Sequence, residues 1–282
     1  MAGLLVNGAA LLLIGVALII PLPQDKVVFL DVGQGDAILL QDGTRQVLID
    51  GGPGMAVLQR LGEELPWFDR RIEVVVATHP DRDHLEGLLH VLERYEVGLV
   101  VLPQLPHTSQ LQEAWLEKLQ EKLARENVAY RFGWGGQQLT IGEQLRVRLL
   151  GPWVEGGALY APGGKTNNGS ILTRVDFHDM SFLLTADAEA VVERKLVPRY
   201  GELLDVEVLK AGHHGSKTST TAELLAAASP NSVVISAGRD NSYGHPHPDV
   251  LARLKDVQVL QTLERGSIRF TRRDRWWLLP AR

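Results

Sequence analysis

The stretch that decides the fold reads Thr78-His79-Pro80-Asp81-Arg82-Asp83-His84. Within six residues it places four side chains that can bind a metal: His79, Asp81, Asp83 and His84. The largely apolar run 71–77 ahead of it has the pattern of a buried strand, and the leucines that follow recur at helical spacing. We therefore expect the four side chains on a loop between the carboxyl end of a strand and a helix, where open α/β folds place their binding groups.

The same stretch also has an ordinary interpretation as a surface turn. His-Pro-Asp is good turn chemistry, and Asp83 with Glu86 three residues later fits a helix cap. This interpretation explains Pro80 and Asp83, but it requires neither of the two histidines nor the second aspartate. The pattern therefore favours a metal site.

Composition limits the kind of metal site. The chain has 282 residues, of which 45% are hydrophobic and 22% are charged, so it can bury a sizeable core. It has no cysteine, which excludes disulfides and thiolate ligands. A net charge of -5 excludes a uniformly basic, nucleic-acid-binding surface, although a local basic patch is compatible with it.

The amino-terminal segment differs from the rest of the chain. Residues 2–22 carry no charged side chain, which is about the length that spans a bilayer. A buried soluble helix is the alternative, but it would rarely lack a polar face so completely. We expect residues 1–24 to form one membrane segment and residues 25–282 to form a single α/β domain of alternating short strands and helices.

Further metal-capable side chains stand at the ends of other apolar runs. Asp50 and Asp187 each follow one, and His213-His214 follow another. We expect a shared sheet edge to gather these groups around two divalent ions, with Asp187 as the bridging carboxylate. An oxygen-rich ligand set favours Mn²⁺ or Mg²⁺ and leaves Zn²⁺ open.

The segment after His214 has features that suit a phosphate group. Ser216 and Lys217 are followed by a run of hydroxyl residues, and Thr220 with Glu223 predicts a capping box. Such a helix start would leave backbone N–H groups exposed beside the histidines, ready to bind an anion.

Three segments together resemble a known family. They are Leu30-Asp31-Val32-Gly33-Gln34-Gly35-Asp36-Ala37, Leu209-Lys210-Ala211-Gly212-His213-His214-Gly215-Ser216 and Tyr243-Gly244-His245-Pro246-His247-Pro248. With the motif at 79–84, they resemble the metallo-β-lactamase domain of ComEC-type proteins, which take up DNA in competent bacteria. The resemblance covers about residues 26–270 and implies a four-layer αββα sandwich with metal-dependent hydrolase activity.

The resemblance also implies a role for each residue. His79 and Asp81 would bind one ion, Asp83 and His84 the other, and His213 is preferred over His214 as a further ligand. The implied catalytic residues are Asp83, His214 and His247, the implied phosphate-binding residues are Ser216, Lys217 and His245, and the implied supporting carboxylates are Asp50 and Asp36. Asp50 would orient a ligating histidine.

The chain departs from the fold-wide pattern at two places. Asp81 stands where most members have histidine, and no obvious third histidine ligand lies between residues 84 and 187. Asn167-Asn168-Gly169-Ser170 occupies that region, and His90, His107 and His178 are poor substitutes by their context. The first ion is therefore expected to have few protein ligands.

These features predict a metal-dependent phosphodiesterase, a nuclease acting on single-stranded DNA during uptake and degrading the strand that is not transported. It would sit at the cell membrane on one span, outside the cytoplasm, with other uptake components as partners. A small-ester or lactone hydrolase is the alternative enzyme, and a catalytically degenerate module of a DNA-transport complex is the non-enzymatic one. The arginines and tryptophans of 265–277 fit a charged edge strand better than a DNA platform.

Overall fold

A computed structural model describes residues 24–105, 109–155, 158–159, 165–272 and 276–279. The predicted membrane segment 1–24 lies outside these ranges, apart from its last residue. Within these ranges, no helix is both long enough and apolar enough to cross a bilayer.

Most of the strands form two mixed sheets. The first sheet has eight strands in the order β17-β16-β1-β2-β3-β4-β5-β6. Its strands are β1 (Asp25–Phe29), β2 (Ile38–Asp42), β3 (Arg45–Ile49), β4 (Arg71–Val76), β5 (Glu96–Pro103), β6 (Ala129–Gly133), β16 (Ile268–Arg272) and β17 (Trp276–Leu278).

The second sheet has seven strands in the order β15-β14-β13-β12-β11-β8-β7. Its strands are β7 (Gln138–Ile141), β8 (Leu145–Leu149), β11 (Thr173–Phe177), β12 (Met180–Leu184), β13 (Val208–Lys210), β14 (Ser232–Ile235) and β15 (Gln258–Gln261). A small separate pair consists of β9 (Val154–Glu155) and β10 (Ala158–Leu159).

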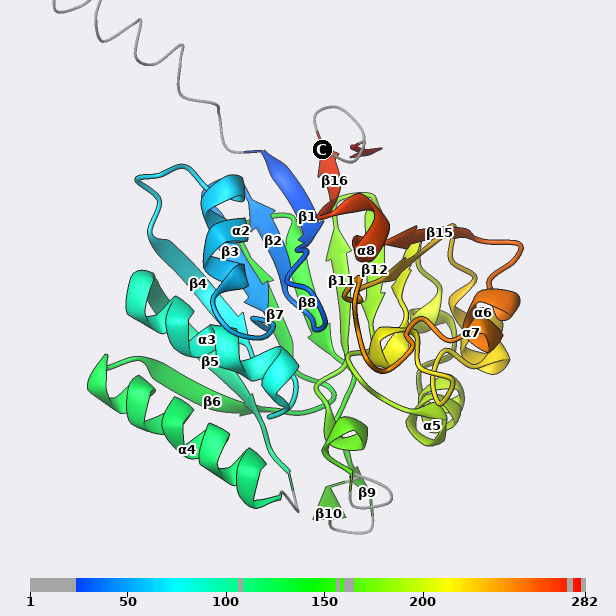
Figure 1. Cartoon of the computed structure of the whole chain (residues 1–282), viewed down its shortest axis with the longest axis horizontal. Coiled ribbons are helices and arrows are strands. Elements are labelled where there is room, and N and C mark those ends of the chain that lie inside the picture. Colours follow the sequence, from blue (N-terminus) through cyan, green and yellow to red (C-terminus); the bar gives the residue numbers. More distant parts are fainter. Residues whose placement is uncertain (1–23, 106–108, 156–157, 160–164, 273–275, 280–282) are drawn as a thin grey trace, which may run out of the picture.

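The helices lie on the two outer faces of the sheets (Figure 1). The first sheet is covered by α2 (Ala56–Glu64), α3 (Arg82–Arg94) and α4 (Gln110–Arg125), and the second by α5 (Ala190–Tyr200), α6 (Ala222–Ala228) and α7 (Pro248–Arg253). A short α8 (Thr262–Arg265) and three 3₁₀ turns, η2 (Thr166–Gly169), η3 (Gly201–Leu204) and η4 (Gly212–Gly215), complete the described elements.

Three apolar cores separate four layers, which are helices, sheet, sheet and helices. Alternation along β1 shows how one strand serves two of these cores. Val27 and Phe29 point to the core between the sheets, whereas Val28 points to the core under α2 and α3. Successive side chains of a strand point to opposite faces, so a strand covered on both sides must be apolar throughout. This arrangement confirms the α/β sandwich expected from the short apolar runs.

The parallel strands determine where the site lies. In the first sheet, β3 runs parallel to β4, with Ile49 opposite Val76. In the second sheet, β12, β13 and β14 run parallel, with Leu184 opposite Lys210 and Lys210 opposite Val234. The segments that follow these strands therefore leave the sheets at shared edges.

The sequence pattern predicted the strand at 71–77, which the structure shows as β4 at Arg71–Val76. It missed β7, a strand of four residues in which exposed and buried residues alternate. It also placed all four residues of the first metal motif on a loop, whereas α3 begins at Arg82. Asp83 and His84 are therefore on the first helical turn, where a negative charge is favourable.

Candidate metal centre

Four strand ends deliver the candidate ligands. Asp50 follows β3, His79 follows β4, Asp187 follows β12, and His213 and His214 follow β13 within η4. All of these side chains except that of His213 are buried, and His213 is 26% exposed. The expected gathering of these residues at one edge is therefore observed.

Asp50 orients two of the histidines. Its carboxylate accepts hydrogen bonds from the Thr78 N–H at 2.8 Å, the Thr78 hydroxyl at 2.7 Å and His84 Nδ1 at 2.8 Å. Because the Thr78 hydroxyl donates to Asp50, its oxygen accepts from His79 Nδ1 at 3.0 Å. In the neutral form of both rings, Nε2 is then the unprotonated nitrogen and is free to bind a cation, which supports the expected orienting role of Asp50.

Close backbone packing keeps α3 against the Asp50 loop. The Gly51 N–H donates to the His84 carbonyl at 2.7 Å, and the Gly87 N–H donates to the Gly52 carbonyl at 2.9 Å. A Cβ on Gly87 would lie 2.0 Å from the Gly51 oxygen. Only glycine permits this approach, which fixes the distance between Asp50 and His84.

His84 and His214 face one another through their Nε2 atoms. His214 Nδ1 donates to the Ser236 carbonyl at 3.0 Å, as His84 Nδ1 donates to Asp50. The two Nε2 atoms then face each other at 3.3 Å. Two lone pairs at that distance repel, so the geometry requires a shared cation, either a metal ion or a proton.

Asp187 lies at the centre of the cluster. Its Oδ1 is 3.3 Å from His84 Nε2, and its Oδ2 is 3.4 Å from His214 Nε2, 3.6 Å from His213 Nε2 and 3.9 Å from His79 Nε2. A carboxylate surrounded in this way by unprotonated nitrogens is suited to bridge two ions.

Unsatisfied atoms test whether metal ions fit here. Among the described residues, His79 Nε2 and Asp187 Oδ1 are buried without a hydrogen-bond partner. Buried polar atoms are normally paired, so both require a partner that is not a protein atom. Nitrogen and oxygen donors also suit Zn²⁺, Mn²⁺ and Fe²⁺, and the residues therefore fit such a cation. The tightest set of potential ligand atoms, all within 4.8 Å of one another, comes from Asp36, His84, Asp187 and His214.

Asp36 differs from the other carboxylates because an ammonium group already holds it. Lys210 is fully buried at the end of β13, and its Nζ forms a very short ion pair with Asp36. The same Nζ donates to the Ala186 carbonyl at 3.1 Å and lies 3.9 Å from Asp187 Oδ1. A carboxylate paired in this way is a poor metal ligand, and this favours the supporting role expected for Asp36.

Asp81 and His213 are partly exposed. Asp81 is 29% exposed, and its Oδ1 accepts from Gln112 Nε2 at 2.6 Å and from the Thr166 hydroxyl at 3.3 Å. Its Oδ2 lies 3.8 Å from His79 Nε2. Asn167 Nδ2 is 3.5 Å from His213 Nε2, so an amide stands near the region where a third histidine was sought.

Backbone strain is concentrated at the site. Four residues other than glycine have positive φ here: Asp50 at 60°, Ala186 at 45°, His213 at 48° and His214 at 54°. Such conformations are unfavourable for residues with a Cβ, and they persist where the surrounding contacts impose them. At His213 and His214 they turn two consecutive side chains toward Asp187.

The cluster shifts the pKa of its members in opposite directions. Burial disfavours the charged forms, but neighbouring charges outweigh it at four residues. His214 and His84 hold the pKa of Asp83 at about 2 and the pKa of Asp187 well below its usual range. Asp187 in turn raises the pKa of His84 and His214 well above 6.5. Burial and the neighbouring His84 lower the pKa of His79. Without metal, protons therefore occupy the place of the cations.

The predicted phosphate-binding residues, Ser216, Lys217 and His245, and the predicted catalytic residue His247 have different surroundings. Ser216 is buried, with its hydroxyl 3.1 Å from that of Thr218, and Lys217 is exposed. The His245 ring lies 5.7 Å from that of His213, and burial, followed by the charge of His213, lowers the pKa of His245 to about 4. His247 instead caps α7, with Nδ1 accepting from the Asp249 N–H at 3.2 Å, which favours a structural role for it.

The expected anion site at the start of α6 is wrong. The N-cap of α6 is Thr221, whose side chain accepts from the Leu224 N–H, whereas the Thr220 hydroxyl accepts from the Gly212 N–H. The N–H groups of Thr220 and Thr221 donate to the buried Glu193 carboxylate at 2.7 and 2.8 Å. The carboxylate of Glu193 therefore binds the backbone N–H groups that were expected to bind an anion.

The histidines considered as a third ligand are engaged elsewhere. His90 pairs with Glu93 on α3, and His178 Nε2 contacts Asp25 at 2.7 Å. His107 lies outside the described residues. No other described histidine between 84 and 187 reaches the cluster, in agreement with the expectation that the first ion has few protein ligands.

Sequence reasoning missed three residues that support the site. The position of Lys210 in the sequence offered a clue, because a lysine at the end of an apolar strand must find a carboxylate if it is buried. Gln112 and Thr166 had none, because their link to Asp81 depends on how α4 and η2 pack.

The prediction of a charged edge holds for Arg269 and Arg272 on β16 and for the tryptophans of β17. Arg265 instead lies on α8, and Arg273 and Arg275 lie outside the described residues. Arg269 is buried and bound to Glu64, and Arg272 pairs with Asp179. Trp276 packs on Phe177, and β17 is the outermost strand of its sheet.

Comparison with known proteins agrees with this architecture. The family described as the metallo-beta-lactamase superfamily matches residues 30–239. The crystal structure of the metallo-beta-lactamase fold protein YhfI from Bacillus subtilis superposes with a TM-score of 0.55 at 14% identity, covering 84% of this chain and 95% of that one. At such low identity this likeness concerns the fold alone.

Two curated competence-related proteins are similar along most of the chain. ComE operon protein 3 of Bacillus subtilis is 30% identical over 89% of this chain, and Competence protein ComA of Neisseria gonorrhoeae is 29% identical over 89% of it. The chain spans only 34% and 33% of their respective lengths. The resemblance inferred from the motifs is therefore confirmed.

Proposed function

This chain belongs to the metallo-beta-lactamase superfamily, whose members are generally metal-dependent hydrolases, and we propose that it is a phosphodiesterase that cleaves DNA. The observation that carries the proposal is the convergence of His84 Nε2 and His214 Nε2, 3.3 Å apart, on the buried Asp187. This arrangement of nitrogen and oxygen donors suits a bound cation.

The proposed roles follow the two sides of Asp187. One ion would be held by Asp83, His84 and His214, and the other by His79, Asp81 and His213. Bound divalent ions activate water and stabilise the charge that develops during phosphoryl displacement. The ligand set is compatible with Mn²⁺ and Zn²⁺, with Mg²⁺ as a further candidate because aspartates contribute much of it.

The protein itself fixes geometry and charge. Asp50 and the Ser236 carbonyl determine the tautomers of the histidines, and this keeps their Nε2 atoms aimed at Asp187. Lys210 neutralises Asp36 beneath the cluster, so an anionic substrate meets one carboxylate charge fewer. Asp83, with a pKa of about 2, is ionised at neutral pH and is suited to accept a hydrogen bond from an attacking water.

A stacking surface for a nucleobase lies beside the site. Tyr243 is 69% exposed, and its ring stacks on that of His245 with 5.7 Å between centroids and 23° between planes. His245 in turn adjoins His213. The Asn241 amide donates to the Gly238 and His245 carbonyls at 2.7 Å each, which fixes this loop. An exposed aromatic face held beside a phosphate-cleaving centre favours a nucleotide substrate, and Ser216, Lys217 and His245 are the proposed phosphate-binding groups.

The biological setting is proposed from the relatives. One of them is named as a competence protein, which fits a role in DNA uptake in which the domain degrades the strand that is not transported. We further propose attachment to the cell membrane through segment 1–24, placement outside the cytoplasm, and contact with other uptake components.

A second candidate is favoured by one specific observation. Asp81 Oδ1 is taken by Gln112, and an amide rather than a histidine stands beside His213. A centre with one weak half would also suit a degenerate, DNA-guiding module. Hydrolysis of a small ester or lactone on the same fold is the other enzymatic possibility.

The deciding experiment uses the full chain, stripped of metal and resupplied with Mn²⁺, Mg²⁺ or Zn²⁺. Labelled single-stranded DNA and bis-p-nitrophenyl phosphate are assayed in parallel, with Asp187→Ala as the control. The proposal expects metal-dependent DNA cleavage that the variant loses. Cleavage of the small ester alone would support the small-ester enzyme, and a folded, metal-binding protein without turnover would support the degenerate module.

A further inference from the structure

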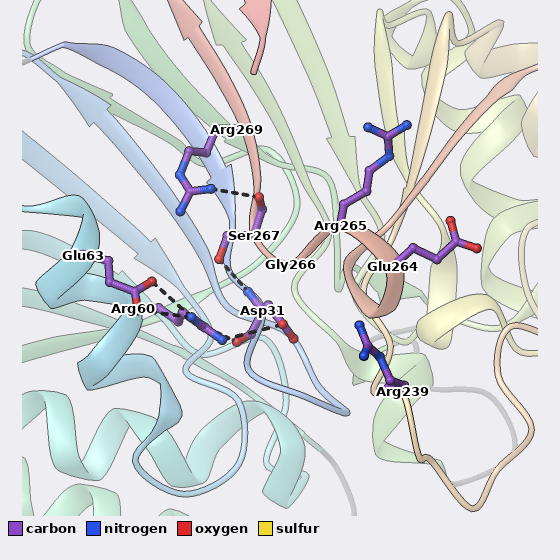
Figure 2. A pocket seen from close by; sticks show the side chains of 9 residues that line it. All are labelled: Asp31, Arg60, Glu63, Arg239, Glu264, Arg265, Gly266, Ser267 and Arg269. Carbon is purple, nitrogen blue, oxygen red and sulfur yellow. Dashed lines mark hydrogen bonds and ion pairs between the residues drawn. The ribbon is translucent and has the colours of Figure 1, made fainter. Parts of the chain in front are cut away.

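A cavity of about 490 Å³ lies outside the metal cluster. It is formed between α2, the segment after β1, the end of β14 and the region from α8 to β16 (Figure 2). Its lining residues are Asp31, Arg60, Glu63, Arg239, Glu264, Arg265, Gly266, Ser267 and Arg269. Four of these residues are arginines, and they differ in whether a carboxylate neutralises their charge.

Two of the arginines are bound to carboxylates. Arg60 pairs with Asp31 at 3.6 Å and with Glu63 at 3.1 Å, and Arg269 pairs with Glu64. Through these contacts, two of the three acidic residues of the lining, Asp31 and Glu63, have a positively charged partner. The remaining acid, Glu264, accepts from Gln261 Nε2 at 3.1 Å and is exposed.

The other two arginines keep their charge. No carboxylate of the described part of the chain pairs with Arg239 or Arg265. Arg239 is nonetheless fixed, because its Nε and Nη2 both donate to the Leu263 carbonyl at 3.1 Å. A neutral carbonyl positions the guanidinium without cancelling its charge, and the other N–H groups of its planar fork remain to bind an anion.

The cavity is linked to the metal cluster through two short segments. Ser236, whose carbonyl orients His214, precedes Arg239 by three residues, so their Cα atoms are at most roughly 11 Å apart. The loop from Asp31 to Asp36 lies alongside, and the Gly238 N–H donates to its Gln34 side chain at 3.1 Å. One strand of nucleic acid is long enough to contact both places.

We propose that this cavity binds a phosphodiester group of the DNA strand other than the one being cleaved, with Arg239 and Arg265 as its ligands. The inference rests on the proposed function and adds a second contact point for the substrate. Phosphate suits the site because a guanidinium binds two phosphate oxygens in parallel. Arg239 and Arg265, which have no carboxylate partner among the described residues, supply the positive charge that it needs.

The test compares the cavity variant Arg239→Gln/Arg265→Gln with a control that removes two charges elsewhere, Arg71→Gln/Arg125→Gln. Arg125 is 69% exposed on α4 and pairs with Glu126. Arg71 is 54% exposed on β4 and pairs with two glutamates, so the loss of both arginines changes net charge without touching the cavity. On single-stranded oligonucleotides, the cavity variant is expected to raise KM about tenfold and to flatten the salt dependence by one to two ionic contacts. On a dinucleotide and on bis-p-nitrophenyl phosphate, neither variant should differ from the parent protein.

Binding of a labelled oligonucleotide in the presence of chelator separates the two proposals. The parent protein should bind and the cavity variant should lose most of that binding, whether or not metal-dependent cleavage occurs. Cleavage of DNA with no difference between the cavity variant and the control would overturn the cavity assignment and leave the nuclease intact. A parent protein that neither binds nor cleaves DNA would overturn both.

Discussion

The candidate ligands on the two sides of Asp187 differ in burial and in hydrogen bonding. The inner half consists of Asp83, His84 and His214. Its two histidines are buried, with their Nδ1 atoms bound to Asp50 and the Ser236 carbonyl, whereas Asp83 is 30% exposed. The outer half consists of His79, Asp81 and His213. There, only His79 is buried and held through Thr78, whereas His213 is 26% exposed. Asp81, at 29%, is about as exposed as Asp83.

This difference predicts unequal ions. Preorganised ligands spend little free energy on ordering when the metal binds, whereas exposed ligands must lose conformational freedom first. The inner half should therefore fill first and remain filled, and the outer half should exchange its ion with solvent. Because the outer half also adjoins His245 and Tyr243, the weakly held ion would be the one nearest to incoming DNA.

Removing the shared carboxylate should have the largest effect. Asp187→Asn takes away the charge that both halves use, so we expect loss of both ions and a fall in turnover of roughly 10³-fold. Metal content of the purified variant and its rate of DNA cleavage check this. Retention of both ions by the variant would mean that Asp187 bridges nothing.

Removing the orienting carboxylate should weaken both halves, whereas removing the Thr78 hydroxyl should weaken only one. Asp50→Asn disturbs His84 directly and His79 through Thr78, so metal affinity should fall about 10- to 100-fold in both halves. The matched variant Thr78→Val keeps the Asp50–His84 contact and should weaken only the outer ion. Calorimetric titration of both variants with Mn²⁺ measures this, and equal losses from Thr78→Val in the two halves would refute the division.

The raised histidine pKa values predict opposite pH dependences with and without metal. In metal-free protein, the stabilisation from His84 and His214 is fully present below pH 6.5 and is lost as the pH rises through their raised folded-state pKa values. The stabilisation from Asp83 is present above pH 3.8 and is lost as the pH falls through about 2.

Metal ions must displace the protons of the inner half, so affinity should rise up to about tenfold per pH unit for each proton released. Denaturant unfolding from about pH 6 to about pH 9, with chelator or with Mn²⁺, tests this. The free energy of unfolding should fall with pH in chelator and rise with pH in Mn²⁺. Parallel slopes would contradict the assignment.

The stacking surface should act on substrate binding alone. Tyr243→Ala should raise KM for single-stranded DNA about tenfold, because an exposed aromatic face contributes about 1–3 kcal/mol per stacked base. Tyr243→Phe keeps the ring and serves as the control. Hydrolysis of bis-p-nitrophenyl phosphate should be unchanged in both, and a parallel loss on that ester would indicate a general disturbance of the site.

The smallest effect is expected at Gln112, which touches only the outer half. Gln112→Ala frees Asp81 Oδ1 from a 2.6 Å hydrogen bond, and we expect a change of a few-fold in the affinity of the weaker ion. The tighter ion should be unaffected in the same titration. A change in the tighter ion would show that the two halves are coupled through more than Asp187.

The site was predictable where side chains follow apolar runs. His79, Asp187 and His214 stand directly after strands, and parallel strands place such residues at one edge. Lys210 was harder to predict, because sequence does not tell whether a lysine at a strand end turns inward or toward solvent. Gln112 and Thr166 reach Asp81 from segments 31 and 85 residues away, and no local pattern encodes such contacts.

The start of α6 shows a different limit. Both Thr220 and Thr221 are suitable caps, and a capping box with Glu223 favoured the first. The buried Glu193, more than twenty residues earlier in the chain, binds both N–H groups and decides in favour of Thr221. A distant carboxylate thus determined a feature that local sequence left ambiguous.

The most direct test of the unequal centre is a titration of the metal-free full chain with Mn²⁺, with bound ions and cleavage of single-stranded DNA followed together. We predict two ions, one bound tightly and one weakly, with cleavage appearing as the second binds. A single ion sufficient for full activity, two ions of equal affinity, or cleavage without metal would contradict it.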